Sequence, residues 1–161
     1  MREDFVYTVA AHIHQATETY RKTDFFIASM KRAGALQVEV LEDEPLPDGG
    51  RRWKAKITEN SRIPAFIRAS DIVIVINESV FSPSEKRLTF RISPAAESVR
   101  VRLEGSIEIK ERAGATELHY SIDLTVGIPL LGRQTEALGL KIVKEECRKQ
   151  ARLLEEWAAH I

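Results

Sequence analysis

The sequence predicts an α+β domain in which one long C-terminal helix packs on an antiparallel sheet of about seven strands. Between residues 36 and 126, apolar side chains recur at every second position, as in strands with one solvent-exposed face. The period changes to three and four residues in two short N-terminal segments and in the last segment. The chain has 161 residues and no linker-like tract, so we expect a single domain over residues 1–161.

The N-terminal segment predicts one strand followed by two short helices. Apolar residues alternate over 5–11, which indicates a strand, and the period becomes helical from Gln15. We expect helices near 15–22 and 25–33. Asp24 is the predicted N-cap of the second helix, and Gly34 fits its C-terminal cap.

The middle of the chain predicts the rest of the sheet. Pro47 and the Asp48-Gly49-Gly50 run mark a turn between the first two of these strands. The segment 72–76 is apolar on both faces, which favours a strand that is covered on both sides or paired with a second copy in a homodimer. The alternating apolar positions are Leu36, Val38, Val40, Trp53, Ala55, Ile57, Leu88, Phe90, Ile92, Val99, Val101, Leu103, Ile107, Ile109, Leu118, Tyr120, Ile122, Leu124 and Val126.

The last segment, from about Leu131 to Ile161, predicts a single long helix. It contains no proline, and its apolar residues recur at spacings of three and four on one broad face. About 30 helical residues span about 45 Å. A helix of this length with an apolar face needs a large apolar surface to cover, and the inner face of the sheet is the surface available.

This order of elements resembles the helix-grip fold of the START-like superfamily, which is also called SRPBCC or birch-pollen-allergen-like. The run 126–132 (VGIPLLG), which leads into a long helix ending at 154–157 (LEEW), is similar to a junction in uncharacterised bacterial families of this superfamily. The run 63–68 (IPAFIR) resembles an insertion in the same group. The resemblance implies a curved sheet and a cavity between sheet and helix, where many members bind lipids, sterols, polyketides or other apolar molecules.

If the chain has such a cavity, a set of large apolar side chains is expected to form its wall. The alternative is a filled core, because large aromatic residues at strand spacing are more often core residues than ligand contacts. The candidate wall residues are Tyr7, Trp53, Phe66, Phe90, Tyr120, Leu124 and Leu138.

The sequence predicts no metal site and no cofactor, and it does not identify catalytic residues. His12 and His14 could share a face and hold a metal, but no third ligand is evident, so a solvated or capping role is favoured. Cys147 lies on the apolar face of the last helix and is expected to be a buried structural thiol. Motifs for a nucleophilic serine, a phosphate-binding loop or a dinucleotide fold are absent. Glu78 either faces inward with the 72–76 face or ends the strand.

Charge argues against nucleic acid as a partner. The 24 basic and 24 acidic side chains cancel, although Arg51, Arg52, Lys54 and Lys56 form a basic cluster that Arg100 and Arg102 could extend. We interpret this cluster as a solvated sheet face. No stretch of 18 apolar residues exists, so stable membrane insertion is not expected. One cysteine and no secretion signal predict a cytoplasmic protein.

Three functional hypotheses follow. The first is a non-enzymatic protein that binds an apolar small molecule or lipid between the sheet and the C-terminal helix, with a phenol of Tyr7 or Tyr120 orienting it. The second is an enzyme of the polyketide cyclase or aromatase kind, with an acid or base in the cavity. The third is an interaction protein with a filled core. Ionisable groups in the cavity discriminate the first two, and a cavity above roughly 300 Å³ discriminates both from the third.

Overall fold

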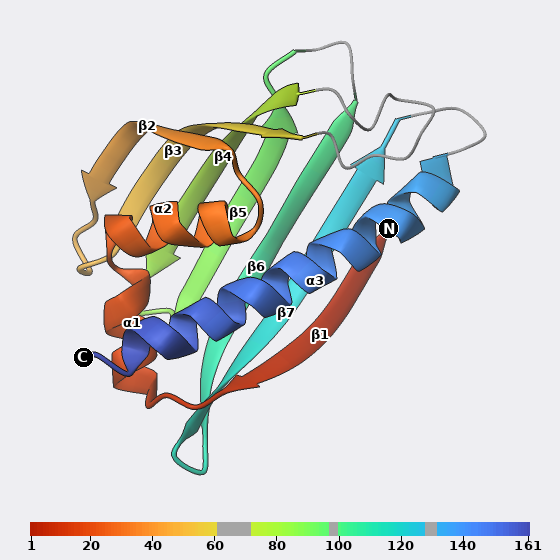
Figure 1. The fold of residues 1–161 in the computed structure, drawn as a ribbon. Coiled ribbons are helices and arrows are strands. Elements are labelled where there is room, and N and C mark those ends of the chain that lie inside the picture. The colour runs from red at the N-terminus through yellow and green to blue at the C-terminus, as the bar shows by residue number, and fades with distance from the viewer. Residues whose placement is uncertain (61–71, 97–99, 128–131) are drawn as a thin grey trace.

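A seven-stranded antiparallel sheet curves around one long helix in the computed structural model, which describes residues 1–60, 72–96, 100–127 and 132–161 (Figure 1). The strand order is β1-β7-β6-β5-β4-β3-β2. This architecture confirms the predicted fold class, with two short helices after the first strand. The elements are β1 (Arg2–Val9), α1 (Ile13–Tyr20), α2 (Thr23–Arg32), β2 (Gln37–Pro45), β3 (Arg51–Asn60), β4 (Ile72–Ser82), β5 (Arg87–Pro94), β6 (Val101–Arg112), β7 (Ala115–Val126) and α3 (Gly132–Ala158).

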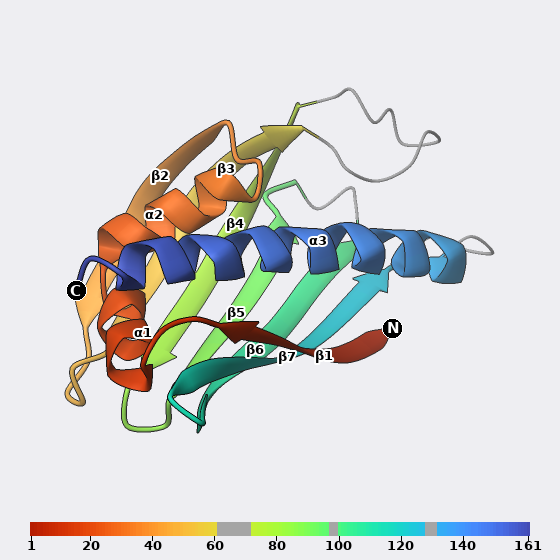
Figure 2. The same cartoon turned by 60° about the horizontal axis from the view of Figure 1, so that its bottom comes forward.

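The topology is a meander with one long return. Strands β2 to β7 pair in sequence order, and β1 pairs with β7, so β1 and β2 form the two edges. The helices α1 and α2 carry the chain from one edge to the other, and α3 lies across the hollow side of the sheet (Figure 2). This arrangement leaves one face of the sheet for the helices and the other for solvent.

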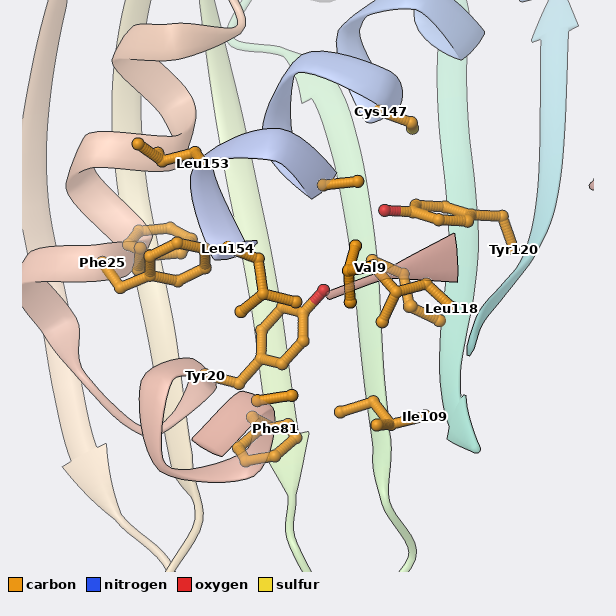
Figure 3. Close-up of a cluster of buried hydrophobic side chains, with 14 of the residues drawn as sticks. Val9, Tyr20, Phe25, Phe81, Ile109, Leu118, Tyr120, Cys147, Leu153 and Leu154 are labelled. Atoms are coloured by element: carbon orange, nitrogen blue, oxygen red, sulfur yellow. The ribbon is translucent and has the colours of Figure 1, made fainter. Parts of the chain in front are cut away.

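A cluster of buried apolar side chains lies where α1, α2 and the C-terminal half of α3 meet the sheet (Figure 3). Leu154 of α3 and Leu118 of β7 are fully buried there, and Tyr20 lies between Phe25 and Phe81. The alternation along the strands explains this arrangement, because inward-facing residues are mostly apolar and outward-facing residues are mostly polar.

The ends of the short helices differ in part from the prediction. Helix α2 begins at Thr23, earlier than expected, with Lys22 as N-cap, so the prediction of Asp24 as N-cap is wrong. Asp24 lies in the first turn instead, where a carboxylate stabilises the helix dipole. Gly34 follows the C-cap with φ 112°, as expected of a terminating glycine. His12 is the N-cap of α1, and its backbone N–H donates to Gln15 Oε1 (3.0 Å).

Strand β4 is not covered on both sides, which was one of the two arrangements expected from its apolar faces. Ile72 and Ile74 lie on the exposed face and are 65% and 39% exposed, whereas Val73 and Val75 lie on the more buried face, and all four residues border the cavity described below. Glu78 continues the outward face and is exposed. Both long sides of β4 are hydrogen-bonded, to β3 and β5, so it offers no free edge for pairing with a second copy.

The basic cluster lies largely on the outer face of the sheet, opposite acidic residues. Glu39, Glu42 and Glu44 on β2 are the cross-strand neighbours of Lys56, Lys54 and Arg52 on β3. Opposite charges at these positions attract each other and reduce the local positive potential. Among the described residues, no helix is long and apolar enough to cross a membrane.

Candidate ligand-binding cavity

A cavity of about 790 Å³ lies between the sheet and the two helices α2 and α3. This volume falls in the range of small-molecule sites, roughly 300–1,000 Å³, and exceeds the threshold that separates a cavity from a filled core. Its described lining is mainly aliphatic and aromatic, and it comes from β3 to β7, from α2 and α3, and from Tyr20 of α1.

The floor of the cavity is the inner face of the central strands. Leu88, Phe90 and Ile92 of β5 point toward the helices but are only partly buried, because no helix side chain covers them completely. Leu103 and Val101 extend this surface on β6. The curvature therefore holds these side chains away from α3 and leaves a space between the layers.

Two glycines shape the walls. Phe90 is paired across the strands with Gly105, where a Cβ would lie 2.6 Å from Phe90 Cζ. On α3, a Cβ at Gly139 would lie 2.6 Å from Leu124 Cδ2. Each glycine thus permits close contact with a large wall residue, and Gly105 lets the Phe90 ring lie against the sheet.

The helices form the opposite side. Ile142, Val143 and Cys147 of α3 and Phe26 and Met30 of α2 face the cavity. The two helices are joined by a hydrogen bond from Gln150 Nε2 to the Ser29 carbonyl oxygen (3.1 Å). This bond holds α2 and α3 together beside the cavity.

The inner end of the cavity is aromatic. The Phe26 and Trp53 rings stack with centroids 5.0 Å apart and planes 4° from parallel. Trp53 Nε1 donates to Thr23 Oγ1 (3.0 Å), which satisfies the indole N–H. Tyr120 and Tyr20 lie in the same region, with their hydroxyls pointing toward each other (Figure 3).

Two buried polar side chains interrupt the apolar lining on β4. Ser79 Oγ donates to Asn77 Oδ1 (2.5 Å), and Asn77 Nδ2 donates to Met30 Sδ (3.2 Å). Both residues line the cavity and are buried. Within the described sheet lining, Asn77 is the one residue whose side-chain amide borders the cavity.

The ionisable groups deepest in the lining stay protonated at neutral pH. Burial raises the pKa of the Cys147 thiol to about 12, and burial also raises the pKa of the Tyr20 and Tyr120 phenols. A reactive cysteine needs a lowered pKa, so Cys147 has the character of a structural thiol, in agreement with the prediction. Glu59 and Glu146 also line the cavity, and each interacts with other groups.

The structure places four of the seven predicted wall residues in the lining: Trp53, Phe90, Tyr120 and Leu124. Tyr7 lies outside it, because its hydroxyl donates to the Lys144 carbonyl oxygen (3.0 Å) and its ring packs edge-on against Tyr120. Leu138 is 44% exposed and lies outside the lining, which corrects its assignment to the wall. Phe66 falls outside the described residues.

Sequence reasoning missed the polar pair Asn77 and Ser79 and the helix residues Tyr20, Phe26 and Met30. Asn77 and Ser79 alternate with Glu78 directly after an apolar run, so they read as the end of a strand. Residues 73, 75, 77 and 79 alternate along one strand, so Asn77 and Ser79 share a face with Val73 and Val75. This alternation was the signal that could have placed them on the inner face.

The comparison with protein families finds a match over almost the whole chain. A family described as "Protein of unknown function (DUF2505)" matches residues 4–158. The chain belongs to this family. No curated protein matches it by sequence.

Solved structures of the same fold cover nearly the whole chain at low identity. TTHA0849 from Thermus thermophilus is 15% identical with a TM-score of 0.70, covering 99% of this chain and 98% of that one. Zhui aromatase/cyclase from Streptomyces sp. R1128 is 13% identical with a TM-score of 0.71, covering 99% and 93%. A START superfamily protein from Mycobacterium smegmatis is 13% identical with a TM-score of 0.67, covering 96% and 97%. The DUF2505 chain therefore has the helix-grip fold of the START-like superfamily.

Proposed function

We propose that this DUF2505 protein binds an apolar small molecule or lipid in the cavity between the sheet and α3. The observation that carries the proposal is the volume of about 790 Å³ with its mainly aliphatic and aromatic lining. Apolar burial supplies about 25 cal/mol per Å², so a ligand that buries roughly 300 Å² gains about 7 kcal/mol before the entropic cost of association. This supports binding without any ionic contact.

A cyclase or aromatase in the same fold is the second candidate, favoured by the likeness to the Streptomyces aromatase/cyclase. Acid–base catalysis needs a group whose pKa lies near the working pH. Burial moves the pKa of Cys147, Tyr20 and Tyr120 away from that range, which favours binding over catalysis. Within the described lining, the carboxyls of Glu59 and Glu146 are the groups left for acid–base catalysis under the enzyme hypothesis. Replacing both with glutamine would abolish turnover under that hypothesis.

The first experiment is native mass spectrometry of the purified protein, followed by organic extraction. The proposal predicts an added mass that disappears on denaturation and an apolar molecule in the extract. A protein of the bare chain mass is next incubated with the neutral fluorophore N-phenyl-1-naphthylamine, whose emission rises in an apolar site. Absence of an added mass together with absence of saturable fluorescence contradicts the proposal.

A matched pair of variants shows where the fluorophore binds. Val143→Trp places a large ring in the cavity from α3, whereas Lys141→Trp places the same ring on the exposed face of that helix. We expect the first variant to weaken binding by at least about tenfold, since it removes volume and apolar contact. The second variant should bind as the parent does. Equal effects of the two would place the fluorophore elsewhere.

A further inference from the structure

We propose that the ligand is uncharged and that Asn77 binds it by donating a hydrogen bond to a carbonyl or hydroxyl oxygen. This inference rests on the proposed function, because it names the chemical class of the molecule that the cavity takes. It is carried by the partners of the Asn77 amide and by the charges of the described lining.

Asn77 is a buried donor with a poor acceptor. Its side chain is 1% exposed and lines the cavity from the inner face of β4, between Ala55 of β3 and Ile92 of β5. Its Oδ1 is well satisfied by Ser79 Oγ at 2.5 Å. Its Nδ2 donates to Met30 Sδ at 3.2 Å, and a thioether sulfur is a weak acceptor. A buried amide N–H gains stability when a carbonyl or hydroxyl oxygen replaces such a partner.

Met30 is suited to give way to that oxygen. It lies on α2, lines the same cavity and is only partly buried. Its unbranched side chain has three rotatable bonds and adapts readily to irregular spaces. Rotation of the Met30 side chain moves the sulfur from Asn77 Nδ2 and lets a ligand oxygen occupy its position, without a change in the backbone.

The charges of the lining favour an uncharged ligand. The described lining contains no lysine, arginine or histidine, and its charged members, Glu59 and Glu146, are both acidic and both already interact with other groups. A ligand carboxylate at the depth of Asn77 would be desolvated without a cation beside it, which is costly. The Tyr20, Tyr120 and Cys147 side chains remain neutral there.

Three naphthalenes of similar size test the inference by isothermal titration: 2-acetylnaphthalene, 2-ethylnaphthalene and 2-naphthoate. They present a neutral acceptor, an alkyl group and a carboxylate on the same ring. We expect 2-naphthoate to bind at least about tenfold more weakly than 2-acetylnaphthalene at pH 8. Equal or tighter binding of the carboxylate would overturn the assignment of an uncharged ligand.

The role of Asn77 is tested by the double variant Asn77→Leu with Ser79→Ala. Because both polar groups of the Ser79–Asn77 hydrogen bond are removed, neither is left buried without its partner. The preference for 2-acetylnaphthalene over 2-ethylnaphthalene should fall by about three- to tenfold, the value of one hydrogen bond. The control Ser79→Ala keeps the Asn77 amide and should keep the preference. An unchanged preference in the double variant would overturn the role of Asn77.

A measurement on the unaltered protein keeps the test valid if the double variant does not fold. The ¹³C resonance of the bound acetyl carbonyl should lie near its position in an alcohol and not near its position in hexane, because a hydrogen bond deshields that carbon. A hexane-like shift contradicts the inference. Binding of all three naphthalenes with equal affinity refutes the inference but keeps the proposed function. If none of the three binds, the inference is refuted, and the proposed function is refuted as well only if the protein also carries no added mass and shows no saturable fluorescence.

Discussion

The attachment of α3 to the sheet can be tested with two leucines of the same helix. Leu154 is 0% exposed and packs among residues of α1, α2 and β1 (Figure 3). Leu138, near the other end of α3, is 44% exposed. Leu154→Ala removes three buried carbons, each worth about 0.8 kcal/mol of transfer free energy. The empty volume left in a rigid core adds to this, so the expected loss is about 3–4 kcal/mol.

Leu138→Ala is the matched control. About half of its side chain is already in water and no enclosed space is created, so we expect a loss below about 1 kcal/mol. Urea unfolding followed by circular dichroism measures both free energies, provided that the denaturant slope stays the same. Equal losses in the two variants would refute the conclusion that α3 is fixed to the sheet mainly through its C-terminal half.

Three other perturbations test the burial of particular side chains. Burial raises the pKa of Cys147 from 9.0 to about 12, so the thiol ionises first in the unfolded chain, and the free energy of unfolding falls as pH rises from about 9 to 12. Cys147→Ala should make this fall with pH less steep. An equally steep fall in the variant contradicts the burial of the thiol. Gly105→Ala should lower the free energy of unfolding by about 1–3 kcal/mol, because the added methyl group displaces Phe90, whereas Ser106→Ala should lower it much less. An unchanged thermal unfolding of the Gly105 variant would show that Phe90 does not need that space. Trp157→Ala should lower the free energy of unfolding by about 2–3 kcal/mol, near the lower limit for core aromatic residues, because the ring is only partly buried. The ring contacts Phe25 edge-on with centroids 5.4 Å apart, and an unchanged melting temperature would contradict this contact.

The periodicity of the sequence was sufficient to predict the elements and their order. Most strands have an inner face of apolar residues at period two, which is fully buried in β3 at Trp53, Ala55 and Ile57. Because a sheet with one solvent-exposed face requires this alternation, the pattern survives in the sequence and can be read from it. The broad apolar face of α3 likewise required a large surface to cover.

Where both faces of a strand are apolar, the pattern does not say which face is buried. In β4 the isoleucines at 72 and 74 lie on the exposed face and the valines at 73 and 75 on the more buried face, so Glu78, which shares the isoleucine face, is exposed. Asn77 is buried because it continues the valine face, although an asparagine is seldom a core residue. Leu138 shows the same limit for a helix, because the apolar pattern does not reveal how far the buried face extends: Thr135 and Leu140 are buried, whereas Leu138 is exposed.

The location of the bound molecule is the most direct test of the central claim that the sheet and α3 enclose a binding cavity. Isotope-filtered NOE spectra of the protein with bound 2-acetylnaphthalene report which methyl groups lie next to the ring. The account predicts contacts from the ring to the methyl groups of Val143 on α3 and of Val75 and Leu103 on the sheet, all in one complex. Contacts only to the exposed methyl groups of Leu138 would contradict it.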